Sequence, residues 1–115
     1  VLFRSIDFIP TPGHSPDHAA LILAAGDDYA CFSGDLLHSP IQFAHPQWNS
    51  AFCGDPRQAE VSRREMMAWG ASHHAQWFTG HFAGPSCGWL EKDKQGDYRW
   101  REAGKQAADK GNSDE

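Results

Sequence analysis

Short apolar segments that end at glycine, proline or aspartate follow one another along most of this 115-residue chain. Segments of this length are typical of strands and too short for buried helices. One longer segment begins with Asp55 and Pro56, a favoured pair for the N-cap and the first residue of a helix. We therefore expect an α/β (α+β) fold with several strands and one main helix. The expected strands are residues 6–10, 18–26, 29–35 and 76–82, with a final hairpin over residues 88–102.

The two ends of the chain differ from its middle. Val1 to Ser5 contains no initiator Met, and we interpret it as a non-native leader that takes no part in the fold. Residues 103–115 are small, polar and charged, which predicts a disordered tail. The length between them allows one domain, which we expect over residues 6–102.

Charge, hydropathy and cysteine usage exclude several classes of protein. The formal net charge is −5 and no cluster of Lys and Arg is present, which argues against a nucleic-acid partner. No apolar run approaches the roughly 18 residues of a membrane-spanning helix, so no membrane partner is expected. Cys31, Cys53 and Cys87 form no C-x-x-C pair. We therefore expect free thiols and a cytoplasmic protein.

Three of the expected strands lead into loops that carry metal-binding side chains. His14 follows the first strand, Asp35 the third and His81 the fourth. Loops at strand ends commonly converge on one site, and imidazole and carboxylate groups are both good ligands for zinc. The loop "TPGHSPDH", residues 11–18, suits a ligand because its prolines restrict the backbone. The residues alone therefore predict a divalent-metal site without fixing the number of ions.

The motifs "TPGHSPDH", "FSGDLLHSP" and "FTGHF", in this order, resemble the later motifs of the metallo-β-lactamase-fold hydrolases. The segment "GDLLHSPIQFAHPQW" and the ending "DYRW" further resemble the lactonase and organophosphate-hydrolase branch. The resemblance covers residues 6–100 and implies half of a four-layer αβ/βα sandwich. That half would have a mixed, mostly antiparallel sheet and one main helix. The family's earlier motif, H-x-H-x-D-H, does not occur in the sequence. The resemblance therefore implies the C-terminal half, with the N-terminal half of the same fold as its partner.

The resemblance also implies a role for each matching residue. His14, Asp35 and His81 would be metal ligands, and Asp35 would take part in catalysis by bridging two metal ions. Thr11 and His18 would support these ligands from behind. Two Zn²⁺ ions per full-length chain are implied, with Fe or Mn as other metals. The full-length parent would act on a small-molecule substrate and could form a homodimer.

Hydrolysis is the reaction that the resemblance implies. A metal-bound hydroxide would attack an ester, a lactone or a phosphotriester. His38 stands where some lactonase-like relatives place a tyrosine that contacts the substrate carbonyl. His38, Phe43, Trp48 and Phe52 are expected to line an apolar substrate pocket. As part of a truncated enzyme, the 115 residues alone are expected to bind metal weakly and to show little activity.

Two other functions stay open. Two histidines and one aspartate also form the facial triad of non-haem iron enzymes, so a mononuclear iron dioxygenase of the same fold is one alternative. A non-catalytic fragment is the other, because the chain carries about half of the ligands of a two-metal site.

Overall fold

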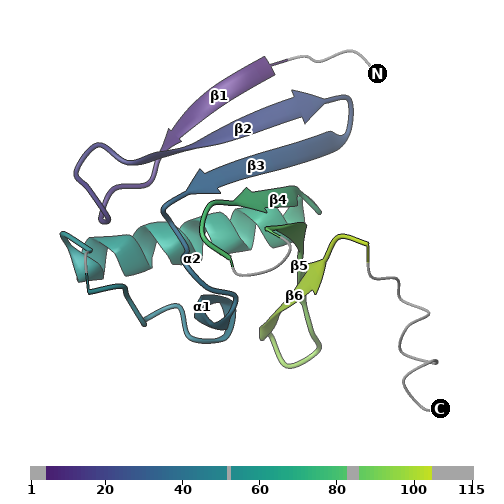
Figure 1. The fold of residues 1–115 in the computed structure, drawn as a ribbon. Helices are drawn as coiled ribbons and strands as arrows, with labels where there is room; N and C mark the ends of the chain where they lie inside the picture. The colour runs from purple at the N-terminus through teal and green to yellow at the C-terminus, as the bar shows by residue number, and fades with distance from the viewer. Residues whose placement is uncertain (1–4, 52, 83–85, 105–115) are drawn as a thin grey trace.

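The computed structural model describes residues 5–51, 53–82 and 86–104 (Figure 1). Most of the expected leader, the expected tail beyond Gly104, and Phe52 lie outside these ranges. No helix among the described residues is long and apolar enough to cross a membrane. The elements, in chain order, are β1 (Ser5–Pro10), β2 (Ala19–Ala25), β3 (Asp28–Gly34), α1 (Ile41–Ala44), α2 (Pro56–Ser72), β4 (Gln76–Thr79), β5 (Cys87–Lys92) and β6 (Tyr98–Glu102).

The strands form one six-stranded sheet in which β1 to β6 lie in chain order. β3 and β4 pair in parallel, with α2 as their crossover, and the other neighbouring strands pair antiparallel. β1, β3 and β4 therefore run in the same direction, and their C-terminal ends lie at the same end of the sheet. The expected mixed, mostly antiparallel sheet with one main helix is confirmed.

α2 begins where the sequence predicts. Asp55 Oδ1 accepts a hydrogen bond of 3.2 Å from the Gln58 N–H, and Pro56 is the first helical residue. The helix runs along one face of the sheet (Figure 1) and buries apolar side chains against it. Gly70 allows this approach, because a Cβ there would lie 2.7 Å from the Trp77 indole. The core consists of Ala20, Ile22, Cys31, Leu36, Leu37, Phe43, Met66, Met67, Trp77, Phe82 and Leu90.

The opposite face of the sheet carries apolar side chains that are exposed. Phe8 is 75 % exposed and Ile6 is 52 % exposed. Phe32 stacks on Phe78 with ring centroids 4.8 Å apart. The strand register places all four on this one face, since directly paired residues point to the same side. The described residues thus form two layers, which agrees with half of a four-layer sandwich.

The segment between β3 and α2 contains a short helix, α1, over Ile41–Ala44. Buried Gln42 organises this segment through its side-chain amide. Its Oε1 accepts hydrogen bonds from the N–H groups of His38 at 2.6 Å and Ser39 at 3.2 Å, and its Nε2 donates to the Trp48 carbonyl at 2.9 Å. One polar side chain, rather than an apolar repeat, therefore stabilises this turn.

Candidate metal centre

The loops after β1, β3 and β4 bring His14, Asp35 and His81 together. His81 Nε2 lies 2.5 Å from Asp35 Oδ1, and His14 Nε2 lies 3.4 Å from Asp35 Oδ2. β4 ends at Thr79, earlier than predicted, so His81 projects from the loop beyond the strand. The three residues singled out by sequence thus meet, with the two histidines on the two oxygens of the Asp35 carboxylate.

The loop that carries His14 is held against the first turns of α2. Gly13 has φ +140°, and a Cβ at this position would lie 2.3 Å from the backbone of Ala59. The Gly13 carbonyl accepts a hydrogen bond of 2.7 Å from the Asp55 N–H, and the Pro12 carbonyl accepts one of 2.7 Å from the Ser62 hydroxyl. Only glycine meets both the backbone angle and the close approach. The loop position is therefore fixed by the helix as well as by its prolines.

His18 links two of the strand ends and is not placed as a ligand. Its Nε2 accepts a hydrogen bond of 3.0 Å from the backbone N–H of Asp35, and its Nδ1 lies 2.8 Å from Thr11 Oγ1. Because Nε2 is an acceptor, the ring proton of the neutral form is on Nδ1 and is donated to Thr11. Both ring nitrogens are therefore occupied by contacts within the chain.

His38 lies beside the candidate ligands Asp35 and His81, closer to them than the expected position in a substrate pocket would require. One ring nitrogen of His38, one of His81 and a carboxylate oxygen of Asp35 all lie within 4.8 Å of one another. The His38 ring stacks on His81 with centroids 4.8 Å apart and lies 5.3 Å from the ring of His14. The sequence carries a weak signal for this, since His38 is three residues from Asp35.

Buried Arg63 holds the loop that carries Asp35 and His38, and the sequence analysis does not identify it. Its Nε donates to the Leu36 carbonyl at 3.0 Å, Nη1 donates to the Pro46 carbonyl, and Nη2 donates to Asn49 Oδ1 at 3.0 Å. Burial lowers the pKa of Arg63, but arginine is a strong enough base to stay charged. Its position four residues after buried Ala59 is a signal that could have placed it on the inner face of α2.

Hydrogen bonding and burial set the charge of the centre. The hydrogen bond with His81 lowers the pKa of Asp35, against the opposing effect of burial; the charges of His81, His14 and His38 also lower it. Burial, followed by repulsion from His81 and His14, lowers the pKa of His38. An ionised Asp35 beside a neutral His38 is the state that offers lone pairs to a cation.

This set of side chains fits a transition-metal ion. Three imidazoles and one carboxylate are the donors that zinc and iron accept in proteins. Within the described residues, Nδ1 of His14 and Nδ1 of His38 are buried without a hydrogen-bond partner, which is uncommon in a protein interior. The side chains of Asp35 and His81 are 40 % and 52 % exposed. The centre is therefore open on one side, where further ligands or a substrate could approach.

No protein-family model and no curated protein matches the chain, but solved structures do. AidC, a dizinc quorum-quenching lactonase, has a TM-score of 0.78 and 27 % identity over 92 % of this chain and 36 % of its own. The hydrolase AbOPH of the beta lactamase superfamily has a TM-score of 0.80 and 25 % identity over 90 % of this chain and 36 % of its own. A probable metal-dependent hydrolase from Staphylococcus aureus has a TM-score of 0.70 and 20 % identity over 85 % of this chain and 36 % of its own.

This chain has the metallo-β-lactamase fold. The resemblance inferred from the three motifs is confirmed, including its restriction to part of the fold. The chain spans about a third of the length of these metallo-β-lactamase-fold hydrolases, namely 36 % of each of the three.

Two of the residues expected in the substrate pocket lie elsewhere in this part of the metallo-β-lactamase fold. Phe43 is buried in the core and stacks on Trp100 with centroids 5.1 Å apart. Trp48 is 48 % exposed and stacks on His45 at 4.0 Å. Neither lines the small cavity beside His14. Apolar character alone does not show whether a side chain lines a substrate pocket or packs in the core. Phe43 packs in the core because its neighbours there are aromatic.

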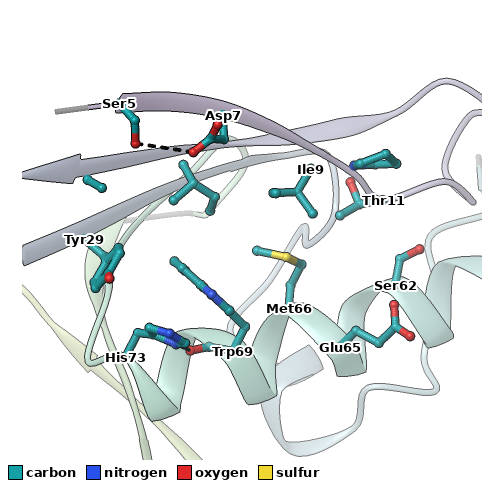
Figure 2. Close-up of a pocket in the computed structure, with 13 residues that line it drawn as sticks. Ser5, Asp7, Ile9, Thr11, Tyr29, Ser62, Glu65, Met66, Trp69 and His73 are labelled. Atoms are coloured by element: carbon teal, nitrogen blue, oxygen red, sulfur yellow. Dashed lines mark hydrogen bonds between the residues drawn. The ribbon is translucent and has the colours of Figure 1, made fainter.

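A cavity of about 540 Å³ lies between β1 to β3 and α2, away from the ligands (Figure 2). Asp7 and Ile9 of β1 point toward Met66 and Trp69 of α2 across it. It contains Thr11 but none of the four candidate ligands. The size of a cavity is therefore a poor guide to the chemistry of this chain.

Proposed function

We propose that this chain is the C-terminal half of a metal-dependent hydrolase that cleaves an ester, lactone or phosphotriester. The meeting of His14, Asp35 and His81 at one end of the sheet carries the proposal. The likeness to AidC, a dizinc lactonase, and to AbOPH, a hydrolase, supports it. A further lactonase structure, of an N-acyl homoserine lactone hydrolase with product at its catalytic metal centre, has a TM-score of 0.58 and 22 % identity, and supports the fold.

In this proposal His14, Asp35 and His81 hold the metal, with two Zn²⁺ ions in the full-length protein. A metal ion bound there supplies a nucleophile near neutral pH by lowering the pKa of a water to about 7. Asp35 contributes negative charge close to the reacting centre and shares its two oxygens between His14 and His81. His18, which Thr11 contacts, accepts the backbone N–H of Asp35 and so helps to hold the backbone of this residue in place.

The missing partner in this proposal is a second layered half that covers the exposed face of the sheet. Ile6, Phe8 and Phe32 present apolar surface there, and the matched hydrolases are about two and a half times as long as this chain. Burial of such surface drives association of sheets. The same half would supply the remaining metal ligands and part of the substrate pocket. Free Cys31, Cys53 and Cys87 support a reducing, cytoplasmic location.

Metal analysis and hydrolysis assays of the longer protein that contains this chain test the proposal. We expect close to two zinc or similar ions per chain and turnover of at least one lactone, phosphotriester or aryl ester. His14→Ala and Asp35→Asn should each abolish most turnover, while His74→Asn, at the far end of β4, should leave it unchanged. Metal-free protein, or full activity in His14→Ala, would contradict the proposal.

The donor set also supports a second function, a mononuclear iron dioxygenase of the same fold. Two imidazoles and one carboxylate are the protein ligands of the iron facial triad, and His14, Asp35 and His81 supply them. Retention of about one iron ion with oxygen uptake, and no hydrolysis, would favour this function over hydrolysis.

A further inference from the structure

His38 has the placement of a ligand rather than of a pocket wall. A wall residue faces a substrate across open space, whereas a ring nitrogen of His38 lies within 4.8 Å of the ligand atoms of both Asp35 and His81. Metal–nitrogen and metal–oxygen bonds of about 2.0–2.2 Å place ligand atoms of one ion roughly 3–4 Å apart, so this separation needs only a small adjustment. Among the described residues, this trio is the group whose ligand atoms are mutually close enough to share an ion.

The backbone of His38 is held firmly. Its N–H donates to Gln42 Oε1 at 2.6 Å, and the carbonyl of Leu36, two residues before it, accepts from Arg63 Nε at 3.0 Å. Both Gln42 and Arg63 are buried. Two buried side chains thus orient a residue that is only partly buried itself. Ligands held in this way lose little freedom when they bind an ion.

The environment of the His38 ring also favours a cation ligand. It lies close to the rings of both His14 and His81, and its Nδ1 is buried without a hydrogen-bond partner among the described residues. An unpaired buried polar atom costs about 1–3 kcal/mol. An ion bound by these imidazoles would use their lone pairs.

We propose that His38 is a direct metal ligand which, with Asp35 and His81, forms a one-ion site contained within this chain. This inference rests on the proposed metal-dependent function and goes beyond it, because the site needs no ligand from another half. His14 lies beside the trio and supplies a further imidazole. Nitrogen and oxygen donors in this number suit a divalent transition ion such as Zn²⁺ or Co²⁺.

Titration of the 115-residue chain with Co²⁺, followed by visible absorption and calorimetry, tests the proposal. We expect one ion per chain with the absorption of a low-symmetry nitrogen and oxygen site. His38→Ala should weaken binding at least about 10-fold, the scale on which even outer partners of metal ligands act. His74→Asn is the matched control, since it removes an imidazole at the opposite end of β4 and should change neither affinity nor spectrum.

A replacement ligand separates direct binding from support of the fold. Cysteine thiolate binds Co²⁺, so His38→Cys should regain most of the affinity lost in His38→Ala and add a thiolate-to-cobalt charge-transfer band. If His38 only supported the fold, His38→Cys would show no thiolate-to-cobalt charge-transfer band. Circular dichroism of each variant, with and without Co²⁺, shows whether the fold survives.

Three results would overturn the proposal: no Co²⁺ binding by the chain, folded or unfolded; unchanged affinity and spectrum in His38→Ala; or His38→Cys without a charge-transfer band. None of these decides whether the longer protein is a hydrolase, which rests on the turnover assays. Conversely, a longer protein that binds metal but hydrolyses nothing would refute the proposed function and leave the role of His38 intact.

Discussion

The backbone N–H of Asp35 donates a 3.0 Å hydrogen bond to Nε2 of His18, a residue on the loop after β1. Nδ1 of the same ring lies 2.8 Å from Thr11 Oγ1, and the Thr11 N–H donates to the His18 carbonyl at 2.9 Å. His18 therefore connects the loop that carries His14 to the strand end that carries Asp35. Two candidate ligands are fixed relative to each other by a side chain whose two ring nitrogens both make contacts within the chain.

His18→Ala should lower the free energy of unfolding by about 1–3 kcal/mol, because it leaves a partly buried N–H of Asp35 without its acceptor. Thr11→Val should cost less, about 0.5–1.5 kcal/mol, since one hydrogen bond is lost. Urea unfolding of both variants and of the double variant measures their coupling. Additive losses would show that the Thr11–His18 contact contributes nothing to stability.

Arg63 should be among the residues whose loss destabilises the chain most. Arg63→Met leaves the carbonyls of Leu36 and Pro46 without a donor, and the expected loss in free energy of unfolding is about 3 kcal/mol. Arg63→Lys keeps the charge but not the fork of donors, so most of the loss should remain.

The neighbouring Arg64 provides the control for Arg63. Its side chain is 54 % exposed and pairs with Glu60, one turn earlier, at 2.8 Å. Exposed pairs of this kind contribute about 0–1 kcal/mol, so Arg64→Met should have little effect in the same urea experiment. Equal losses at Arg63 and Arg64 would show that the buried hydrogen bonds of Arg63 are not stabilising.

Gly34 and Gly26 form a second matched pair. Both have positive φ, +56° and +63°, where alanine costs about 1–2 kcal/mol. A Cβ at Gly26 meets no atom within 4 Å, whereas one at Gly34 would lie 3.0 Å from His18 Nε2. Gly34→Ala should therefore destabilise the chain more than Gly26→Ala in thermal unfolding. The reverse order would mean that the ring of His18 moves aside at no cost.

Local signals along the sequence predict the parts of the fold that depend on neighbouring residues. Asp55 and Pro56 mark the start of α2, and the strand ends before His14 and Asp35 are where Pro10 and Gly34 interrupt the apolar segments. These features depend on backbone angles and capping groups, which are properties of the residue itself.

Residues whose role depends on distant partners are not predictable in this way. Arg63 is buried because carbonyls of a loop earlier in the chain accept its donors. Phe43 joins the core because Trp100 and Phe82 pack against it. His38 approaches His81 only because β3 and β4 pair in parallel. These residues are visible in the sequence, but which of them become neighbours depends on how the strands pair in the sheet.

Cys31 gives a prediction that depends on burial alone. It is fully buried in the core, and burial raises the pKa of its thiol to about 12 from an ordinary value of about 8.5. Since the thiolate is the reactive form, Cys31 should resist a disulfide reagent at about pH 8 in the folded chain. Cys53 and Cys87 are only partly buried and should react first, and all three should react after unfolding in guanidinium.

The same thiol should make stability depend on pH in the alkaline range. The unfolded chain loses the Cys31 proton above about pH 8.5, while the folded chain keeps it to about pH 12. The folded state then binds more protons, so the free energy of unfolding falls as pH rises through this window, by at most about 1.4 kcal/mol per pH unit from this group. Cys31→Ala should remove this part of the decline while costing some packing energy at neutral pH. A decline of unchanged steepness in Cys31→Ala would assign the alkaline instability to other groups.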